Sequence, residues 1–288
     1  MFEIREEIDF EFLKKHVRES LEEDIGSGDL TTTFTVGPGD SGRGRFVSRE
    51  TGIIAGLGLL KIVYDLLAEK ASARIDYSWK TADGKKIEAG QVIAEVEGPL
   101  AILLTGERVA LNYLQQLSGV ASATGRLVDI AANYDVKIYD TRKTVPHLRL
   151  LQKYAVRCGG GCNHRLRLDK AVMIKDNHKQ AAGGLTCALQ KVDFDAVDEV
   201  VVEIHSPAEI DEAVNFDIDV LMLDNIKPDR IKDICKSIPG DLSVELSGGI
   251  TDSNLEEVCK TGIERVSVGS ITHSFHSLDI SFGLIDNG

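Results

Sequence analysis

The chain has 288 residues, 43% of them hydrophobic and 27% charged, which excludes extensive disorder and allows one large or two moderate domains. The formal net charge of −13 argues against non-specific binding to nucleic acid or to an anionic membrane. Five cysteines without paired spacing indicate reduced thiols rather than a disulfide framework or a zinc site. The N-terminus is charged and no apolar run approaches ~18 residues, so we expect a cytoplasmic protein without a membrane span.

The first part of the chain mixes helix and strand signals. Residues 10–23 predict an amphipathic helix, and the sequence GSGDLTT at 26–32 predicts a loop. Residues 83–98 alternate short apolar runs with glycine turns, which is typical of a small β-sandwich or hammerhead. Lipoyl and biotinyl modules share this pattern, but no lysine stands at the tip of a hairpin here, and we reject that interpretation.

A long helical stretch follows at residues 106–132. Its apolar residues keep near-helical spacing, which predicts an amphipathic helix that connects two domains. Gly119 and Gly125 interrupt the pattern, so we expect either a bend or two separate helices.

From residue 135 onward one unit repeats, consisting of a short apolar run, a polar or glycine-rich residue and an amphipathic helix. The runs are at 136–139, 171–174, 200–204, 219–223, 242–246 and 265–268. Strands that alternate with helices predict a parallel sheet of βα units, and near-continuous apolar strands indicate burial on both faces. Because a Rossmann glycine fingerprint is absent, we favour a barrel, complete or incomplete, over an open doubly wound sheet.

Polar residues stand at the ends of all six predicted strands, where a βα barrel carries its active site. The first two ends supply cations, the next two carboxylates, and the last two glycine and small hydroxyls. In chain order they are Asp140–Thr141–Arg142–Lys143, Lys175, Glu203, Asp224, Ser247–Gly248–Gly249 and Gly269–Ser270. A lone charge after a strand is usually a terminator, but four charged ends with complementary signs indicate a site.

Two features sharpen this prediction. Glu203 lies in an otherwise apolar strand, where a carboxylate is costly unless it is paired or liganded. It can be structural, paired with Lys143 or Lys175, but we favour a functional role. Residues 142–175 hold nine Lys or Arg and one acid, which indicates an anion site, and the glycines after the last two strands suit phosphate.

The segment DTRKTVPHLRLLQKYAVRCGGGCNHRLRLDKAVMIKDNH at 140–178 resembles the quinolinate phosphoribosyltransferase family, also called nicotinate-nucleotide pyrophosphorylase (carboxylating). The resemblance includes GDLTT (28–32), GERVALNYLQQLSGVAS (106–122), LMLDN (221–225) and ELSGGI (245–250), and so covers nearly the whole chain. It implies an α/β fold with a small N-terminal α/β sandwich domain, residues 1–110, and an open, incomplete parallel α/β barrel, residues 111–271. The tail, about 272–288, is expected to pack on the first domain.

The resemblance also implies an activity. The family transfers phosphoribose from phosphoribosyl pyrophosphate to quinolinate, with loss of CO₂, and forms nicotinate mononucleotide on the route to NAD with Mg²⁺ as cofactor. It implies that Arg142, His164 and Arg165 hold the quinolinate carboxylates. Lys143 and Lys175 are then ligands of pyrophosphate and substrate.

Further site residues are carried over in the same way. Glu203 and Asp224 lie near the ribose hydroxyls and Mg²⁺ and, with the two lysines, form the catalytic set. The 5′-phosphate cradle contains Ser247, Gly248 and Gly269, and the adjacent Thr141, Gly249 and Ser270 also contact substrate. Arg108 reaches the site of a partner subunit, which implies a homodimer or a hexamer of dimers.

The sequence departs from the usual family pattern at several positions. Relatives usually read Thr-Pro-Gly where this chain has Val145-Pro146-His147, Arg167 replaces a frequent glycine, and Val201 replaces a common glutamate. The alternative enzyme is a paralogue similar to the molybdenum-cluster protein ModD, which uses another acceptor. A further alternative is a non-catalytic binding protein of the same fold.

Overall fold

The computed structural model describes residues 9–226, 228–235, 238–240 and 242–285. The chain divides into two compact units. The first comprises Met1–Ala123, Leu150–Gly160 and Phe275–Gly288, and the second comprises Thr124–Arg149 and Gly161–Ser274. The helix α4 (Leu100–Ala131) contains the boundary at which the chain passes from one unit to the other.

The first unit is built on a four-stranded antiparallel sheet with the order β12-β1-β5-β3. Its strands are β1 (Ser41–Ser48), β3 (Asp76–Trp79), β5 (Val92–Pro99) and β12 (Ile280–Ile285). A smaller sheet pairs β2 (Gly52–Ile53) with β4 (Lys86–Ile87). The helices besides α4 are α1 (Phe10–Ile25), α2 (Leu30–Thr35), α3 (Leu57–Ala71) and α5 (Arg149–Cys158). Fully buried Leu13, Phe46 and Tyr64 pack in the core of this unit.

Local chemistry explains where its helices begin. The predicted helix at 10–23 is confirmed as α1, and the side chain of Asp9 accepts a hydrogen bond from the Glu11 amide, 3.1 Å away. The predicted loop at 26–32 is wrong at its end, because α2 begins at Leu30. Asp29 caps this helix through the Thr32 amide at 3.0 Å, and its charged carboxylate is stabilised by Thr32, so its pKa is lowered.

Of the two alternatives for the stretch at 106–132, two separate helices are excluded, because α4 is one continuous helix. Gly119 serves close packing, since a Cβ atom there would stand 2.9 Å from the Cα of Ser277. The helix backbone at Gly119 is therefore in close contact with the backbone at Ser277, more than 150 residues later in the chain.

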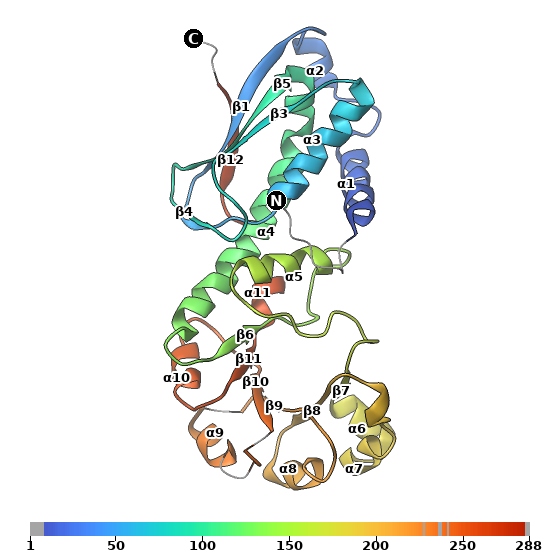
Figure 1. The fold of residues 1–288 in the computed structure, drawn as a ribbon, viewed down its shortest axis with the longest axis vertical. Coiled ribbons are helices and arrows are strands. Elements are labelled where there is room, and N and C mark those ends of the chain that lie inside the picture. The colour runs from blue at the N-terminus through green and yellow to red at the C-terminus, as the bar shows by residue number, and fades with distance from the viewer. Residues whose placement is uncertain (1–8, 227, 236–237, 241, 286–288) are drawn as a thin grey trace. The chain divides into compact units, whose positions relative to one another are not determined.

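The second unit is an open parallel sheet of six strands with the order β6-β11-β10-β9-β8-β7. All six predicted runs form strands, which are β6 (Lys137–Tyr139), β7 (Val172–Ile174), β8 (Val200–Ile204), β9 (Val220–Asp224), β10 (Ser243–Ser247) and β11 (Arg265–Ser267). The sheet curves, and β6 and β7 are its two edges, so the barrel is incomplete in the part of the chain that the structure describes (Figure 1). The predicted fold class is confirmed.

Short helices lie on the outer side of this curved sheet (Figure 1). They are α6 (Asp176–Ala182), α7 (Leu185–Leu189), η1 (Phe194–Ala196), α8 (Pro207–Ala213), α9 (Pro228–Cys235) and α10 (Leu255–Cys259), and α11 (Ser270–His273) follows β11. Val201 is fully buried and packs with Val220 and Met222, so its departure from the family pattern serves the core. None of the described helices is long and apolar enough to cross a membrane.

Candidate active site

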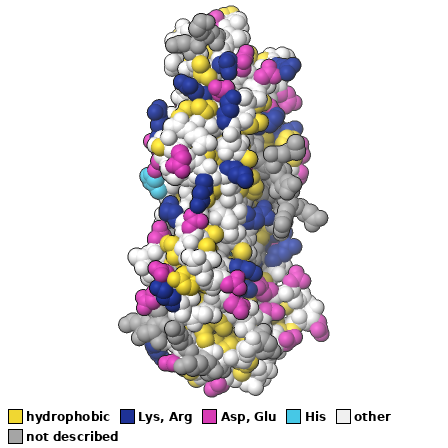
Figure 2. Space-filling model, turned by 60° about the vertical axis from the view of Figure 1, so that its left-hand side comes forward, with side chains coloured by type: hydrophobic (Ala, Val, Ile, Leu, Met, Phe, Trp, Pro, Cys, Tyr) yellow, Lys and Arg dark blue, Asp and Glu magenta, His cyan; other side chains and the backbone are white. Residues whose placement is uncertain are grey.

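The predicted site residues of the second unit follow its strands directly. Asp140 comes after β6, Lys175 after β7 and Ser247 ends β10, while Asp224 ends β9 and Glu203 lies near the end of β8. Because parallel strands end at the same edge of the sheet, the topology brings these positions to one rim. On the face drawn in Figure 2, basic and acidic side chains are interspersed, so the surface charge there is mixed.

Glu203 and Lys175 form the central ion pair of this rim. The Glu203 side chain is only 9% exposed and accepts a hydrogen bond from Nζ of Lys175, whose side chain is 42% exposed. Of the two lysines considered as partners from sequence, the structure selects Lys175. A half-exposed ammonium is free to exchange its carboxylate for an incoming anion, so the pairing is compatible with a functional role.

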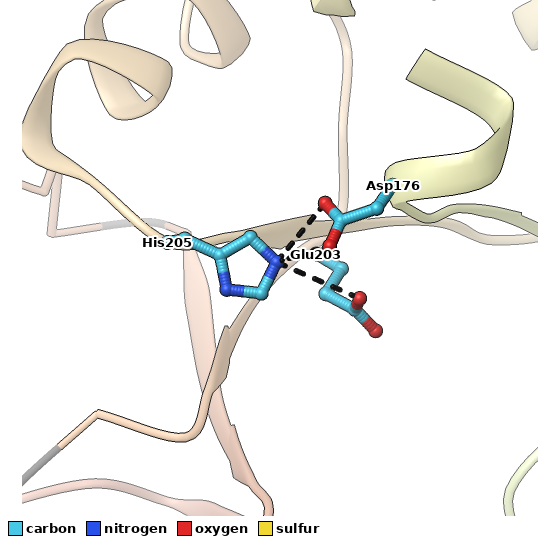
Figure 3. A group of neighbouring side chains, drawn as sticks. All are labelled: Asp176, Glu203 and His205. Carbon is cyan, nitrogen blue, oxygen red and sulfur yellow. Dashed lines mark hydrogen bonds and ion pairs between the residues drawn. The ribbon is translucent and has the colours of Figure 1, made fainter. Parts of the chain in front are cut away.

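Two residues that the sequence analysis missed converge on Glu203 (Figure 3). Asp176 begins α6 and His205 directly follows β8. The His205 Nε2 atom lies 2.9 Å from Asp176 Oδ2 and 3.8 Å from Glu203 Oε1. One ligand atom from each of the three residues lies within 4.8 Å of the others, so together they could hold a divalent cation. Their positions next to two predicted site residues were the available signal.

The joint cation site of Glu203 and Asp224 stays a prediction. Asp224 accepts a hydrogen bond from Asn225 Nδ2 at 2.7 Å and is not among the converging ligands. The Asp176 carboxylate is 3.1 Å from Lys179, whose hydrogen bond lowers the pKa of Asp176. Carboxylates together with an imidazole suit Mn²⁺ or Zn²⁺, whereas Mg²⁺ would use the carboxylate oxygens alone.

Arg142 and Arg165 form a pair of like charges. Burial, and then the neighbouring charge of Arg142, lowers the pKa of Arg165, while Nη1 of Arg165 donates to the Ala171 carbonyl at 2.7 Å. The Arg142 Nε atom is buried without a hydrogen-bond partner. Neither guanidinium makes an ion pair with a carboxylate within the described ranges. Although the charge of Glu199 also acts on Arg165, two adjacent cations without an ion-paired carboxylate are suited to bind an anion with more than one carboxylate.

His164 is buried beside Glu245 and Arg165. Its side chain is 4% exposed, and both ring nitrogens contact protein groups, with Nδ1 accepting from the Arg165 amide at 3.0 Å and Nε2 lying 3.3 Å from Glu245. The backbone amide of His164 donates to the fully buried Asp140 at 2.8 Å. The ring therefore faces the protein interior, and its direct contact with quinolinate stays a prediction.

The predicted phosphate cradle combines glycines with close side chains. Gly248 (φ +95°) and Gly249 (φ +64°) adopt left-handed conformations, and a Cβ at Gly248 would overlap the Asn225 side chain. Ser247 accepts a hydrogen bond at its carbonyl from the Asn225 amide, 2.8 Å away. Gly269 precedes Ser270, the first residue of α11.

The basic loop after β6 contains further predicted residues. Thr141 Oγ1 accepts from the Lys143 amide at 3.0 Å, and the Lys143 carbonyl accepts from Thr272 Oγ1 at 2.8 Å. His147 has φ +64°, a left-handed conformation that glycine adopts without strain. This explains physically why the family pattern has glycine at that position.

Arg108 lies on α4 in the first unit, away in sequence from the rim residues. Its side chain is 58% exposed and 4.0 Å from Glu107. Such an exposed pair contributes little to stability, so the guanidinium is available for another partner.

Sequence comparison assigns both parts of the chain. Residues 29–118 match the sequence model of the N-terminal domain of quinolinate phosphoribosyl transferase, and residues 120–283 match that of its C-terminal domain. The chain belongs to the quinolinate phosphoribosyltransferase family. It is 42% identical over 271 residues to a probable nicotinate-nucleotide pyrophosphorylase [carboxylating] of Bacillus subtilis, covering 93% of this chain and 92% of that protein. The corresponding enzyme of Mycobacterium leprae is 36% identical, covering 96% and 98%.

Solved structures of the quinolinate phosphoribosyltransferase family have the same fold. The nicotinate-nucleotide pyrophosphorylase of Francisella tularensis superposes with a TM-score of 0.91 at 36% identity, covering 96% of this chain and 98% of that one. NadC from Streptococcus pyogenes gives a TM-score of 0.90 at 35% identity, with coverage of 97% and 99%. The family assignment from the motifs at 140–178 is therefore confirmed.

Proposed function

We propose that this chain is a decarboxylating quinolinate phosphoribosyltransferase, a pentosyltransferase of NAD biosynthesis. It transfers phosphoribose from phosphoribosyl pyrophosphate to quinolinate and releases pyrophosphate, CO₂ and nicotinate mononucleotide. The observation that carries the proposal is the 42% identity, over 93% of the chain, to a relative named for this reaction. The cation pair Arg142 and Arg165, which lacks a carboxylate partner within the described residues, suits the two adjacent carboxylates of quinolinate.

In the proposed mechanism, Arg142 and Arg165 orient quinolinate so that its ring nitrogen faces the anomeric carbon of the ribose. The nitrogen attacks as the bond from that carbon to pyrophosphate breaks. Glu203 and Asp224 stabilise the positive charge that develops on the ribose. Lys143 and Lys175 neutralise the departing pyrophosphate, which requires Lys175 to exchange Glu203 for phosphate oxygens.

Decarboxylation follows from the first step. Once the ring nitrogen carries the ribose, its positive charge stabilises the electron pair left when the carboxylate at the adjacent carbon departs as CO₂. A proton then takes the place of CO₂. No separate organic cofactor is required, because the alkylated ring is its own electron sink.

We further propose that the enzyme uses Mg²⁺, which when bound would neutralise pyrophosphate charge. Glu203 is the residue shared by the expected pair with Asp224 and by the observed group with Asp176 and His205. Hard carboxylate oxygens of this kind fit Mg²⁺, which also takes phosphate oxygens from its substrate.

Assembly and location are part of the proposal. We propose a homodimer, or a hexamer of dimers, in which Arg108 enters the partner's site, and a cytoplasmic location. The exposure of the Arg108 side chain and its weak pairing with Glu107 support the proposal that its guanidinium binds in the partner's site.

The activity is tested with purified protein, quinolinate, phosphoribosyl pyrophosphate and Mg²⁺, by following nicotinate mononucleotide in the ultraviolet. Formation of that product with one equivalent of pyrophosphate supports the proposal. Binding of both substrates without turnover would instead support a binding protein. Turnover only with other acceptors would support a paralogue.

A further inference from the structure

Glu245 is a buried carboxylate that the proposed mechanism does not use. It lies in the middle of β10, is 0% exposed, and stands between Met222 of β9 and Arg265 of β11 in the strand register. Burial of an ionised carboxylate is costly unless cations and hydrogen-bond donors surround it. The surroundings of Glu245 therefore indicate what the residue does.

Three side chains contact the two oxygens of Glu245. Ser267 donates a short hydrogen bond to Oε1, His164 Nε2 lies 3.3 Å from the same oxygen, and Arg265 Nε lies 3.1 Å from Oε2. Burial alone raises the pKa of Glu245, but His164, Ser267 and Arg265 outweigh it, so the pKa is lowered overall. The carboxylate is therefore ionised. Of its three partners, His164 is the neighbour in sequence of Arg165, which belongs to the proposed anion site.

The hydrogen bonds of His164 assign its tautomer. Nδ1 accepts a hydrogen bond from the Arg165 amide at 3.0 Å, so this nitrogen carries no proton. In the neutral ring the proton is then on Nε2, which lies 3.3 Å from the negative Oε1 of Glu245. A carboxylate next to one ring nitrogen keeps the proton on that nitrogen and leaves the other nitrogen as an acceptor, as in metal-bound histidines.

The opposite side of the ring determines the position of Arg165. Its backbone is held by His164 Nδ1 and its guanidinium by the Ala171 carbonyl, at 2.7 Å, next to Arg142. Asp140 adds a second anchor, because it accepts from the His164 amide at 2.8 Å and from Asn163 Nδ2 at 2.7 Å. In the other tautomer, Nδ1 would carry a proton that points at the N–H of the Arg165 amide. The two hydrogens would repel, and the backbone at Arg165 would move.

We infer that Glu245 is a positioning residue of the quinolinate site, which holds His164 in the Nε2–H tautomer and thereby fixes Arg165 for the substrate carboxylate. This inference rests on the proposed function, since its kinetic readout is the KM for quinolinate. It also gives buried His164 an indirect role, consistent with its 4% exposure.

The tautomer is tested first, without any change to the site. The ¹⁵N shifts of protonated and unprotonated ring nitrogens differ strongly, and His164 is assigned among the seven histidines by the signal missing in His164→Gln. In the neutral form of the ring we expect a proton on Nε2 only. A proton on Nδ1 of His164 in the wild-type enzyme would overturn the inference.

The kinetic test compares Glu245→Gln with Glu199→Gln. Glu199 also pairs with Arg265, at 3.2 Å, but has no contact with His164 among those described, so it is the matched control. We expect Glu245→Gln to raise the KM for quinolinate roughly ten- to hundredfold, the range for loss of a partner that orients a histidine. The KM for phosphoribosyl pyrophosphate should stay within roughly twofold. Glu199→Gln should raise neither KM, because it removes a negative charge that acts on Arg165 and so does not weaken anion binding. Glu245→Asp should restore part of the effect.

The outcomes separate the two hypotheses. Absence of turnover in the wild-type enzyme would overturn the proposed function. Normal wild-type turnover together with an unchanged KM for quinolinate in folded Glu245→Gln would overturn only the role of Glu245, as would equal rises in both KM values. If Glu245→Gln does not fold, the wild-type tautomer decides.

Discussion

The side chain of Lys143 lies against Gly269, where a Cβ atom would stand 3.1 Å from Lys143 Cδ and 3.1 Å from His273 Nε2. The loop after β6 and the start of α11 are also joined by the hydrogen bond from Thr272 Oγ1 to the Lys143 carbonyl, at 2.8 Å. The predicted pyrophosphate lysine and the predicted phosphate glycine are thus in contact. A change in one must displace the other.

Gly269→Ala is expected to lower kcat/KM by about tenfold or more, because the added methyl group pushes Lys143 away and narrows the approach of phosphate to the backbone. The melting temperature should change little, since flexible side-chain ends give way. Steady-state kinetics and thermal melting measure the two effects. Gly283→Ala is the control, as no atom lies within 4 Å of a Cβ at that position. An equal kcat/KM in Gly269→Ala and Gly283→Ala would show that the contact between Lys143 and Gly269 does not matter for catalysis.

Lys143→Ala should remove most turnover while the protein stays folded. Loss of one charge contact to the departing pyrophosphate typically costs about a hundredfold or more. The measurement is kcat with saturating substrates, with melting as a check of folding. Lys191→Ala removes an exposed lysine outside the rim and should be silent. Near wild-type turnover in Lys143→Ala would refute its catalytic assignment.

Glu203→Gln keeps the shape of the side chain and removes its charge. We expect slow chemistry with substrate binding largely retained, because the negative charge matters most when the ribose becomes cationic. Single-turnover kinetics and equilibrium binding separate the two steps. A change confined to KM would instead identify Glu203 as a ligand of the ground state.

Asp176→Asn should weaken divalent-cation binding, because it removes one of the three ligands that converge beside Glu203. Titration with Mn²⁺, followed by the loss of the free-ion signal in electron paramagnetic resonance, measures affinity without catalysis. Asp211→Asn, which changes an exposed carboxylate on α8, is the control. Comparison with Asp224→Asn shows which carboxylate accompanies Glu203. An unchanged affinity in Asp176→Asn would exclude Asp176 as a ligand.

Arg108 is tested by complementation between inactive variants. Arg108→Ala and Lys143→Ala are mixed under conditions that exchange subunits. If Arg108 acts in the partner's site, each mixed dimer has one intact site and one that lacks both residues. Random pairing should then restore about a quarter of wild-type activity. No recovery, with exchange confirmed separately, would place Arg108 in its own subunit's site or outside catalysis.

The sequence predicted the barrel strands well, since a strand buried on both faces leaves a continuous apolar run such as VVVEI at 200–204. It also predicted Glu203 and Lys175 as site residues, because a charge that follows or interrupts such a run is conspicuous. The ion pair between them had been one of two alternatives. Only the folded chain could select it.

What escaped prediction depends on contacts between distant segments. His205 contacts Asp176, 29 residues earlier. Both residues lie close in sequence to predicted site residues, but the sequence does not show that the two meet. Gly119 resembled a helix breaker, yet the backbone at Ser277 requires it within a continuous helix. The inferred orientation of His164 depends on Glu245, and the sequence around Glu245 does not show that a histidine will lie beside it.

The position of β12 has a consequence for biosynthesis. Residues 280–285 are the last described segment of the chain, yet they form an edge of the first unit's sheet, where Arg43 pairs with Ile285 and the Phe46 and Phe282 rings lie 4.9 Å apart. During synthesis on the ribosome, β1 and β5 can pair early, but the edge strand β12 is made only after the second unit. Until the segment after the second unit has been synthesised, the first sheet therefore exposes an unpaired edge at β1, which β12 then covers.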